Sequence, residues 1–160
     1  MNDGLYNINL SYSKERLQAE FSDTSTFEYF FAPHKPEQKF DYKWLIKRVD
    51  GGYGQELSDK FSSLLDVTDI RPRFMIQRSG YSLGFHKDAG TACSINFVCN
   101  NDPGPINFRD GPEYYEVALL NTQVDHAVLE TKEDRWLFKL SIFDKTYDEV
   151  KSILMKHGKI

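Results

Sequence analysis

The sequence has few cysteines. Among its 160 residues only Cys93 and Cys99 carry a thiol. Six residues along one strand, at about 3.3 Å each, would separate them by about 20 Å, far beyond the Cα separation of about 5.5 Å in a typical disulfide. We therefore expect two partly buried free thiols in a reducing compartment, the cytoplasm.

The sequence also lacks an excess of positive charge and a long apolar run. It has 20 Lys and Arg against 24 Asp and Glu, for a formal net charge of −4. Binding to nucleic acid without sequence preference needs clustered positive charge, so we expect no nucleic-acid partner. No stretch approaches the roughly 18 apolar residues of a membrane helix, and the first residues do not resemble a signal peptide. We expect no membrane partner.

No internal repeat and no linker rich in Pro, Gly and Ser divides the chain. Its length, with 40% hydrophobic and 28% charged residues, is typical of one ordinary domain, which we expect to span residues 1–160. Aromatic residues reach 14%, including 12 Phe and 9 Tyr. This composition favours a structure rich in β-strands.

The hydrophobic pattern predicts a helix followed by short strands. Apolar residues at helical spacing predict an amphipathic helix over Glu56–Leu65 and another over Tyr147–Lys156, and the glycine-rich residues 51–54 predict a turn. Strands are predicted over Leu5–Tyr12, Ile70–Gln77, Ala92–Val98, Ile106–Phe108, Tyr114–Leu120, Gln123–Leu129 and Arg135–Phe143. Short strands at this spacing are typical of a sandwich or barrel, with the first helix covering one sheet face.

One local motif, His86-Lys87-Asp88, carries metal-ligand chemistry. In a strand, residues two apart point to the same face, so His86 and Asp88 would meet at one point while Lys87 is solvated. His126 follows forty residues later in a predicted strand, and its neighbour Asp125 would point away. Two histidines and one carboxylate form the facial triad of non-haem Fe(II) oxygenases. A His-x-Asp pair alone is a weak signal, because it occurs by chance in many proteins.

Arg135 adds a further signal, nine residues after His126. It opens a predicted strand that is otherwise mostly apolar, where an unpaired charge is costly. Its planar guanidinium matches a carboxylate through two parallel hydrogen bonds. The simpler alternative is a salt bridge with Glu133 or Asp134.

Together these residues resemble the 2-oxoglutarate- and Fe(II)-dependent oxygenases, whose pattern is His-x-Asp, a distal His and an Arg about nine or ten residues later. The resemblance covers roughly residues 69–143. Residues 80–85 resemble the strand that leads into the His-x-Asp motif of this family. Residues 92–97 and 101–105 are similar to short stand-alone members related to prolyl and aspartyl/asparaginyl hydroxylases.

The resemblance implies a mainly β fold, the double-stranded β-helix or jelly-roll (cupin) core, with a few helices packed on the larger sheet. It implies that His86, Asp88 and His126 bind Fe(II), and that Arg135 binds the distal carboxylate of 2-oxoglutarate. The implied activity uses O2 to hydroxylate an amino acid, a peptidyl prolyl or aspartyl/asparaginyl side chain, or a small metabolite. Succinate and CO2 are released.

The chain departs from this pattern at secondary positions. Many short members carry Arg near the position of Thr91, and Asn near Leu129 and Glu130. Other contacts to 2-oxoglutarate are therefore open, with Asn96 and Ser94 as candidates.

Two other functions remain open: a cupin-like metal-binding protein without oxygenase activity, and a cupin isomerase or hydrolase that uses another divalent metal. Dependence on 2-oxoglutarate separates them from an oxygenase.

Substrate recognition is less defined. Arg73, Gln77 and Arg109 lie where they could face the mouth of the barrel, although we expect each to be an ordinary solvent-facing residue. Tyr81 and Trp136 are expected in the core. The substrate and the oligomeric state are not specified by the sequence.

Overall fold

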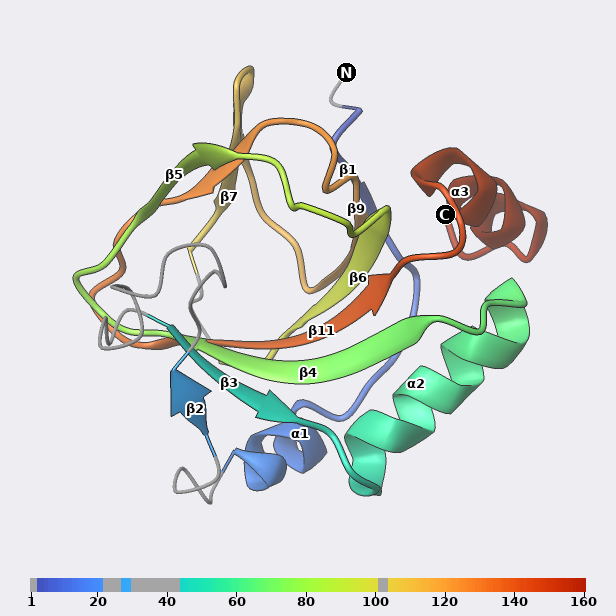
Figure 1. Cartoon of the computed structure of the whole chain (residues 1–160), viewed down its shortest axis with the longest axis horizontal. Helices are drawn as coiled ribbons and strands as arrows, with labels where there is room; N and C mark the ends of the chain where they lie inside the picture. Colours follow the sequence, from blue (N-terminus) through green and yellow to red (C-terminus); the bar gives the residue numbers. More distant parts are fainter. Residues whose placement is uncertain (1–2, 22–26, 30–43, 101–103) are drawn as a thin grey trace.

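The computed structural model describes residues 3–21, 27–29, 44–100 and 104–160. In this part of the chain two antiparallel sheets face each other, and the helices lie on the far side of the larger sheet (Figure 1). The larger sheet is ordered β1 (Leu5–Asn7), β9 (Val117–Leu120), β6 (Cys93–Val98), β11 (Arg135–Ile142), β4 (Ile70–Gln77), β3 (Trp44–Arg48) and β2 (Glu28–Tyr29). The smaller sheet is ordered β5 (Leu83–His86), β10 (His126–Val128), β7 (Ile106–Phe108) and β8 (Gly111–Glu113).

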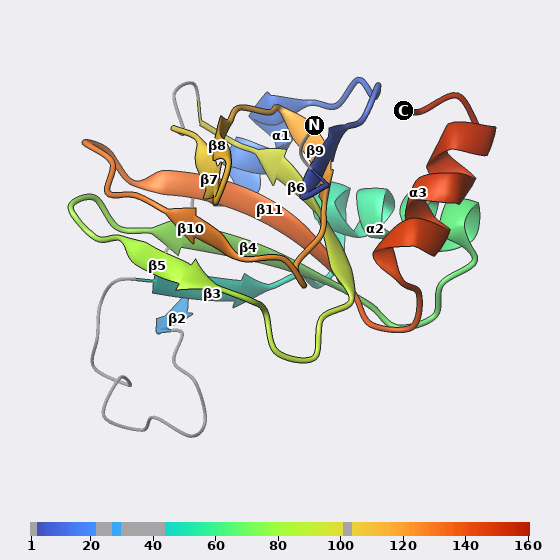
Figure 2. The same cartoon turned by 90° about the horizontal axis from the view of Figure 1, so that it is seen from above.

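This arrangement confirms the predicted double-stranded β-helix. The chain alternates between the sheets after β4, because β5, β7, β8 and β10 belong to the smaller sheet while β6, β9 and β11 belong to the larger one. Seen from above, β5 and β10 lie over the larger sheet (Figure 2). The predicted strands Ile70–Gln77 and Ile106–Phe108 have the observed bounds, whereas the first strand ends at Asn7 rather than Tyr12.

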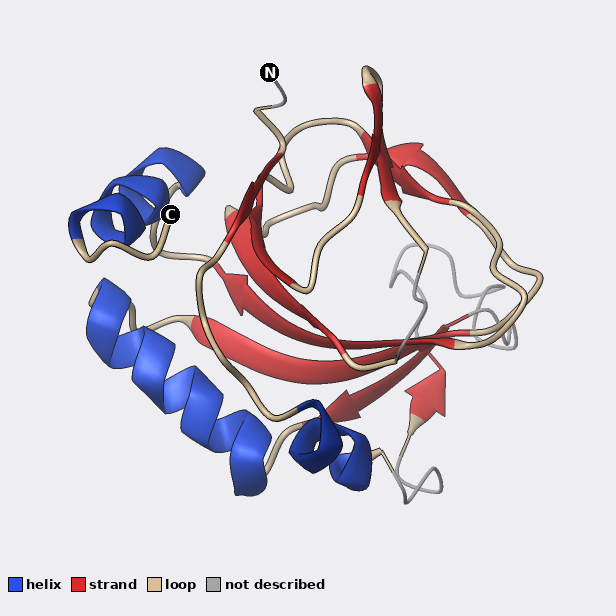
Figure 3. Ribbon diagram, turned by 180° about the vertical axis from the view of Figure 1, so that it is seen from behind, coloured by secondary structure: helices blue, strands red, loops and turns tan. Residues whose placement is uncertain are grey.

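The helices α1 (Lys14–Glu20), α2 (Gly52–Leu65) and α3 (Tyr147–Lys156) lie behind the larger sheet, as Figure 3 shows. Between them and the sheet is a hydrophobic core whose largest fully buried side chains include Phe61, Phe74 and Phe138. None of the helices in the described ranges is long and apolar enough to cross a membrane. The helices thus cover one face of the sheet and leave the other to face the smaller sheet.

Helix α2 begins at Gly52, so the predicted turn over residues 51–54 was wrong. A Cβ atom on Gly54 would lie only 3.1 Å from the ring of Phe138 and 3.2 Å from that of Phe74, so this glycine allows the helix to approach the sheet closely. The carboxylate of Glu20 accepts a hydrogen bond from the backbone N–H of Gly54, at 3.1 Å. Sequence patterns missed this helix start because glycine has a low helix propensity.

Strand β11 shows how the larger sheet presents two different faces. Phe138 and Leu140 point to the helices and are fully buried in the core. The alternate residues Arg135 and Lys139 therefore point toward the smaller sheet. The polar side chains of this second face form the candidate site.

Candidate metal centre

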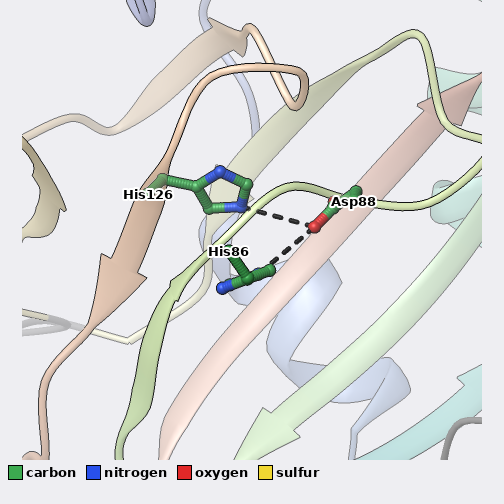
Figure 4. Close-up of side chains that lie close together, drawn as sticks. All are labelled: His86, Asp88 and His126. Atoms are coloured by element: carbon green, nitrogen blue, oxygen red, sulfur yellow. Dashed lines mark ion pairs between the residues drawn. The ribbon is translucent and has the colours of Figure 1, made fainter.

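His86, Asp88 and His126 come together between the two sheets (Figure 4). His86 ends β5 and pairs directly with His126 at the start of β10. Asp88 lies in the loop after β5, not in the strand as expected, and its backbone N–H donates to the carbonyl of Thr122 at 2.9 Å. Asp88 Oδ1 is 3.3 Å from His86 Nε2 and 3.4 Å from His126 Nε2. One potential ligand atom from each residue lies within 4.8 Å of the others.

Both imidazoles are oriented by backbone carbonyl groups. His86 Nδ1 is 2.8 Å from the oxygen of Gly84, and His126 Nδ1 is 2.9 Å from the oxygen of Val124. When Nδ1–H donates to these oxygens, Nε2 of each ring faces Asp88. It can donate to the carboxylate while it carries a proton, and it offers its lone pair to a metal once that proton is lost. This is the second hydrogen bond that orients and polarises metal-bound histidines.

The surroundings of Asp88 keep its carboxyl group ionised. Burial opposes ionisation, but hydrogen bonds from His126 and His86 and the nearby Lys139 hold the pKa of Asp88 well below its usual range. Lys139 Nζ lies 2.9 Å from Asp88 Oδ2, the oxygen that does not face the histidines. The hydrogen bond with Asp88 raises the pKa of His86, against the opposing effect of burial.

The donor set suits a divalent cation. Two neutral imidazoles and one carboxylate leave coordination positions open, as in the facial triad of non-haem Fe(II) sites. The His126 side chain is 9% exposed, that of Asp88 18% and that of His86 29%. The site is therefore most open beside His86 on β5, the edge strand of the smaller sheet.

A second polar cluster lies on the larger sheet near the trio. Arg135 opens β11 as predicted and is 4% exposed. Its Nη2 donates to the hydroxyl of Tyr115 at 3.2 Å, and Asn96 Nδ2 is 3.3 Å from the same oxygen. Ser94 Oγ donates to Asn96 Oδ1 at 3.0 Å. Ser94 and Asn96 thus join Arg135 in one network through Tyr115.

Arg135 retains unused hydrogen-bonding capacity. Its Nε has no partner among the described residues, and no carboxylate in the described ranges forms an ion pair with its guanidinium. Asp134, a candidate partner, instead accepts a hydrogen bond from the backbone N–H of Ser79 and lies 3.9 Å from Arg78. A buried guanidinium with a free Nε–H fits a bound carboxylate.

Two functional candidates, Tyr115 and Lys139, were not found from the sequence. Tyr115 is 8% exposed while its neighbour Tyr114 is 68% exposed, and the adjacent pair gives no sign of which ring is buried. Lys139 had a usable signal, because it lies four residues after Arg135 and so on the same face of a mostly apolar strand.

The remaining predictions had mixed outcomes. Lys87 and Arg109 are exposed as predicted, and Arg109 pairs with Asp125 at 3.3 Å. Gln77 was expected at the surface but is 1% exposed, and its side chain donates to the carbonyl groups of Tyr81 and Leu129.

Of the two aromatic residues expected in the core, Trp136 stacks on Phe21 with ring centroids 5.0 Å apart. Tyr81 is 39% exposed, so its prediction was wrong. The predicted free thiols of Cys93 and Cys99 are present and buried.

Comparison with known proteins identifies the fold. No protein-family model matches the sequence, and a search of curated proteins gave no match. A Trichoplax adhaerens prolyl hydroxylase, solved with a peptide of the hypoxia inducible factor oxygen degradation domain, has a TM-score of 0.67 at 14% identity. This match covers 92% of the present chain and 85% of the hydroxylase.

Two other hydroxylases have the same architecture. A Pseudomonas putida prolyl-4-hydroxylase has a TM-score of 0.61 at 14% identity, covering 87% of this chain and 91% of that one. A collagen prolyl hydroxylase of Paramecium Bursaria Chlorella virus-1, solved with 2-oxoglutarate, has a TM-score of 0.51 at 9% identity, with coverage of 86% and 93%. At these identities the likeness establishes the shared fold.

Proposed function

We propose that this chain is a 2-oxoglutarate- and Fe(II)-dependent oxygenase that hydroxylates an amino acid, a peptidyl side chain such as prolyl or aspartyl/asparaginyl, or a small metabolite. The observation that carries the proposal is the pairing of two sites on facing sheets. The trio His86, Asp88 and His126 suits a divalent cation, and the buried Arg135 offers a free donor to a carboxylate. The buried thiols Cys93 and Cys99 support a reducing compartment such as the cytoplasm.

The trio would hold Fe(II). Bound Fe(II) supplies the redox chemistry by which O2 and 2-oxoglutarate are consumed and a C–H bond is hydroxylated, with succinate and CO2 as co-products. The chain contributes the orientation of its ligands. The carbonyl groups of Gly84 and Val124 fix the two rings, and Lys139 fixes the carboxylate of Asp88 through its second oxygen.

The cluster around Arg135 would bind the distal carboxylate of 2-oxoglutarate. The Tyr115 hydroxyl already accepts hydrogen bonds from Arg135 and Asn96, so its own proton is available for a carboxylate oxygen. Ser94 holds Asn96, which in turn orients Tyr115. Thus Ser94 and Asn96 act as positioning residues, while Arg135 and Tyr115 contact the co-substrate.

A metal-binding protein without oxygenase activity, or a cupin isomerase or hydrolase, would need only the metal trio. Neither requires a buried guanidinium with an unused Nε–H on the facing sheet. The cluster around Arg135 therefore favours the oxygenase, and dependence on 2-oxoglutarate is the property that separates the three.

The proposal predicts that substitution of the metal ligands stops the conversion of 2-oxoglutarate to succinate. With Fe(II), O2 and a proline-containing peptide, the wild-type chain should form succinate, and Asp88→Ala and His86→Ala should reduce its rate by more than about 100-fold. Loss of a group that merely orients a ligand already costs about 10–100-fold. Succinate can be measured by chromatography.

Asp125→Ala is the matched control, because this carboxylate is adjacent to His126 but pairs with the exposed Arg109. It should retain the wild-type rate. Near-normal succinate formation by Asp88→Ala or His86→Ala would refute the ligand assignment.

A further inference from the structure

We propose that the substrate of this site carries a carboxylate, which binds to Arg73 and Arg48 on the metal-facing side of the larger sheet. The proposal rests on the proposed function, because it names the substrate class for the same metal centre. It follows from a row of cationic residues that runs across three adjacent strands and ends next to Asp88.

The strand register defines this row. Arg48 on β3 is directly opposite Arg73 on β4, and Arg73 is directly opposite Lys139 on β11. Directly opposed residues point to the same face of a sheet. Because Lys139 Nζ contacts Asp88, Arg73 and Arg48 also point to the metal side. With strands about 4.8 Å apart, their backbones lie one and two strand spacings from that of Lys139.

The charges in this region are not balanced. Lys139 pairs with Asp88, and Arg71 pairs with Asp69 at 2.9 Å. Arg73 and Arg48 form no ion pair within the described part of the chain. Two guanidinium groups on the metal-facing side of the larger sheet are therefore without an ion-pair partner among the described residues.

Arg73 is not an ordinary solvated arginine. Its side chain is half-buried, and burial together with the charges of Arg71 and Arg48 lowers its pKa. Placing a partly desolvated cation beside like charges is unfavourable unless an anion compensates it. A bound carboxylate would supply that charge and two hydrogen-bond acceptors in the plane of the guanidinium.

The position of the row separates it from the co-substrate cluster. From Lys139, the cluster with Asn96, Tyr115 and Arg135 extends along β11 and toward β6. The arginine row extends the opposite way, across β4 and β3. This is also the side of β5, which bears the most exposed metal ligand and lies over these strands in Figure 2. The two anion sites thus lie on different sides of one metal centre.

The test compares acids with their neutral isosteres. The N-acetyl α-amides of Asp and Glu, and those of Asn and Gln, are titrated into Zn(II)-loaded protein with saturating 2-oxoglutarate, and binding is followed by NMR. In the wild-type chain at least one acid should bind about tenfold or more tightly than its amide, as expected for a charge-assisted hydrogen bond. Arg73→Gln should abolish this preference.

Arg16→Gln is the control, since it removes the same charge from an exposed position on helix α1, where Arg16 pairs with Glu56. It should keep the preference, and thermal melting checks that both variants fold. The proposal is overturned if the wild-type chain binds no acid more tightly than its amide, or if Arg73→Gln retains the preference. If the protein prefers the acids but 2-oxoglutarate does not chelate Fe(II) in it, the proposed function is refuted while the anion site is supported.

Discussion

At the scale of single residues, Lys139 lies between the candidate metal site and the polar residues of the larger sheet. Its ammonium group is 2.9 Å from one oxygen of Asp88 and thereby turns the other toward the histidines. The same residue lies between Asn96 and Arg73 in the register of the larger sheet. One side chain therefore borders the metal centre, the co-substrate cluster and the proposed substrate row.

The raised pKa of His86 predicts how metal binding depends on pH. In the metal-free protein the bond to Asp88 stabilises the imidazolium, so a proton must leave before Nε2 can bind a metal. Zn(II) affinity should be constant above the pKa of His86 and fall as the pH drops below it, by up to about tenfold per pH unit for one proton released. Competition with a chromogenic chelator measures the affinity.

This pKa lies above the ordinary value of 6.5, so the decline should begin at a higher pH than for an unperturbed histidine. The shift is to higher pH because a histidine with a raised pKa stays protonated up to a higher pH. Affinity that stays constant from about pH 8 to about pH 5, through the ordinary pKa range of histidine, would contradict this account.

At the scale of elements, helix α3 shows how local sequence secures the layer behind the sheet. Thr146 accepts a hydrogen bond from the backbone N–H of Glu149, and the Glu149 carboxylate accepts one from the backbone N–H of Thr146. This capping box satisfies both groups at the start of the helix. It holds Val150 and Leu154 in the core.

Thr146→Ala should therefore destabilise the fold by about 1 kcal/mol, the usual cost of losing an N-cap side chain. Thermal or urea unfolding measures the change, and Thr146→Ser should restore most of it because serine caps equally well. Equal stability of the alanine and wild-type chains would show that the capping box contributes nothing here.

How far the sequence predicts the fold also depends on the element. Residues Ile70–Gln77 and Tyr147–Lys156 have the bounds that their hydrophobic period predicts, because burial on one face determines them. The edge strand β8 (Gly111–Glu113) contains Gly and Pro, which are depleted in strands, so hydrophobic patterns do not predict it. Helix α2 starts on glycines for a packing reason that no local pattern contains.

The site was predictable where one short motif carried it. His-x-Asp and the spacing to His126 and Arg135 indicated four residues that the fold brings to facing sheets. Tyr115 was missed because its contacts with Arg135 and Asn96 form only in the folded chain. For Lys139, the spacing from Arg135 indicates the face of the strand but not the contact with Asp88. That information comes from tertiary structure and not from spacing along the chain.

At the scale of the whole molecule, the two sheets carry different parts of the candidate site. The smaller sheet and its loop carry the proposed metal ligands, while the larger sheet carries the proposed anion-binding groups on its inner face and the hydrophobic core on its outer face. A metal bound by the trio would join β5, the following loop and β10. It should therefore stabilise the native state as a whole.

Zn(II) at about 100 times its dissociation constant should add about 2.7 kcal/mol to the free energy of unfolding. For a chain of this length, this corresponds to a Tm increase of roughly 5–10 °C. Differential scanning calorimetry measures the shift. Asp88→Ala should show little of it, and a similar increase in this variant would place the metal elsewhere.

The central claim is that one metal centre and Arg135 together bind 2-oxoglutarate. The most direct measurement is an anaerobic titration of the Fe(II)-loaded protein with 2-oxoglutarate, in which chelation produces a weak visible charge-transfer band. We predict a saturable band that Arg135→Ala loses at the same ligand concentration. If no band forms while Fe(II) is demonstrably bound, the claim is wrong, and the chain is a metal-binding cupin in which Arg135 has a structural role.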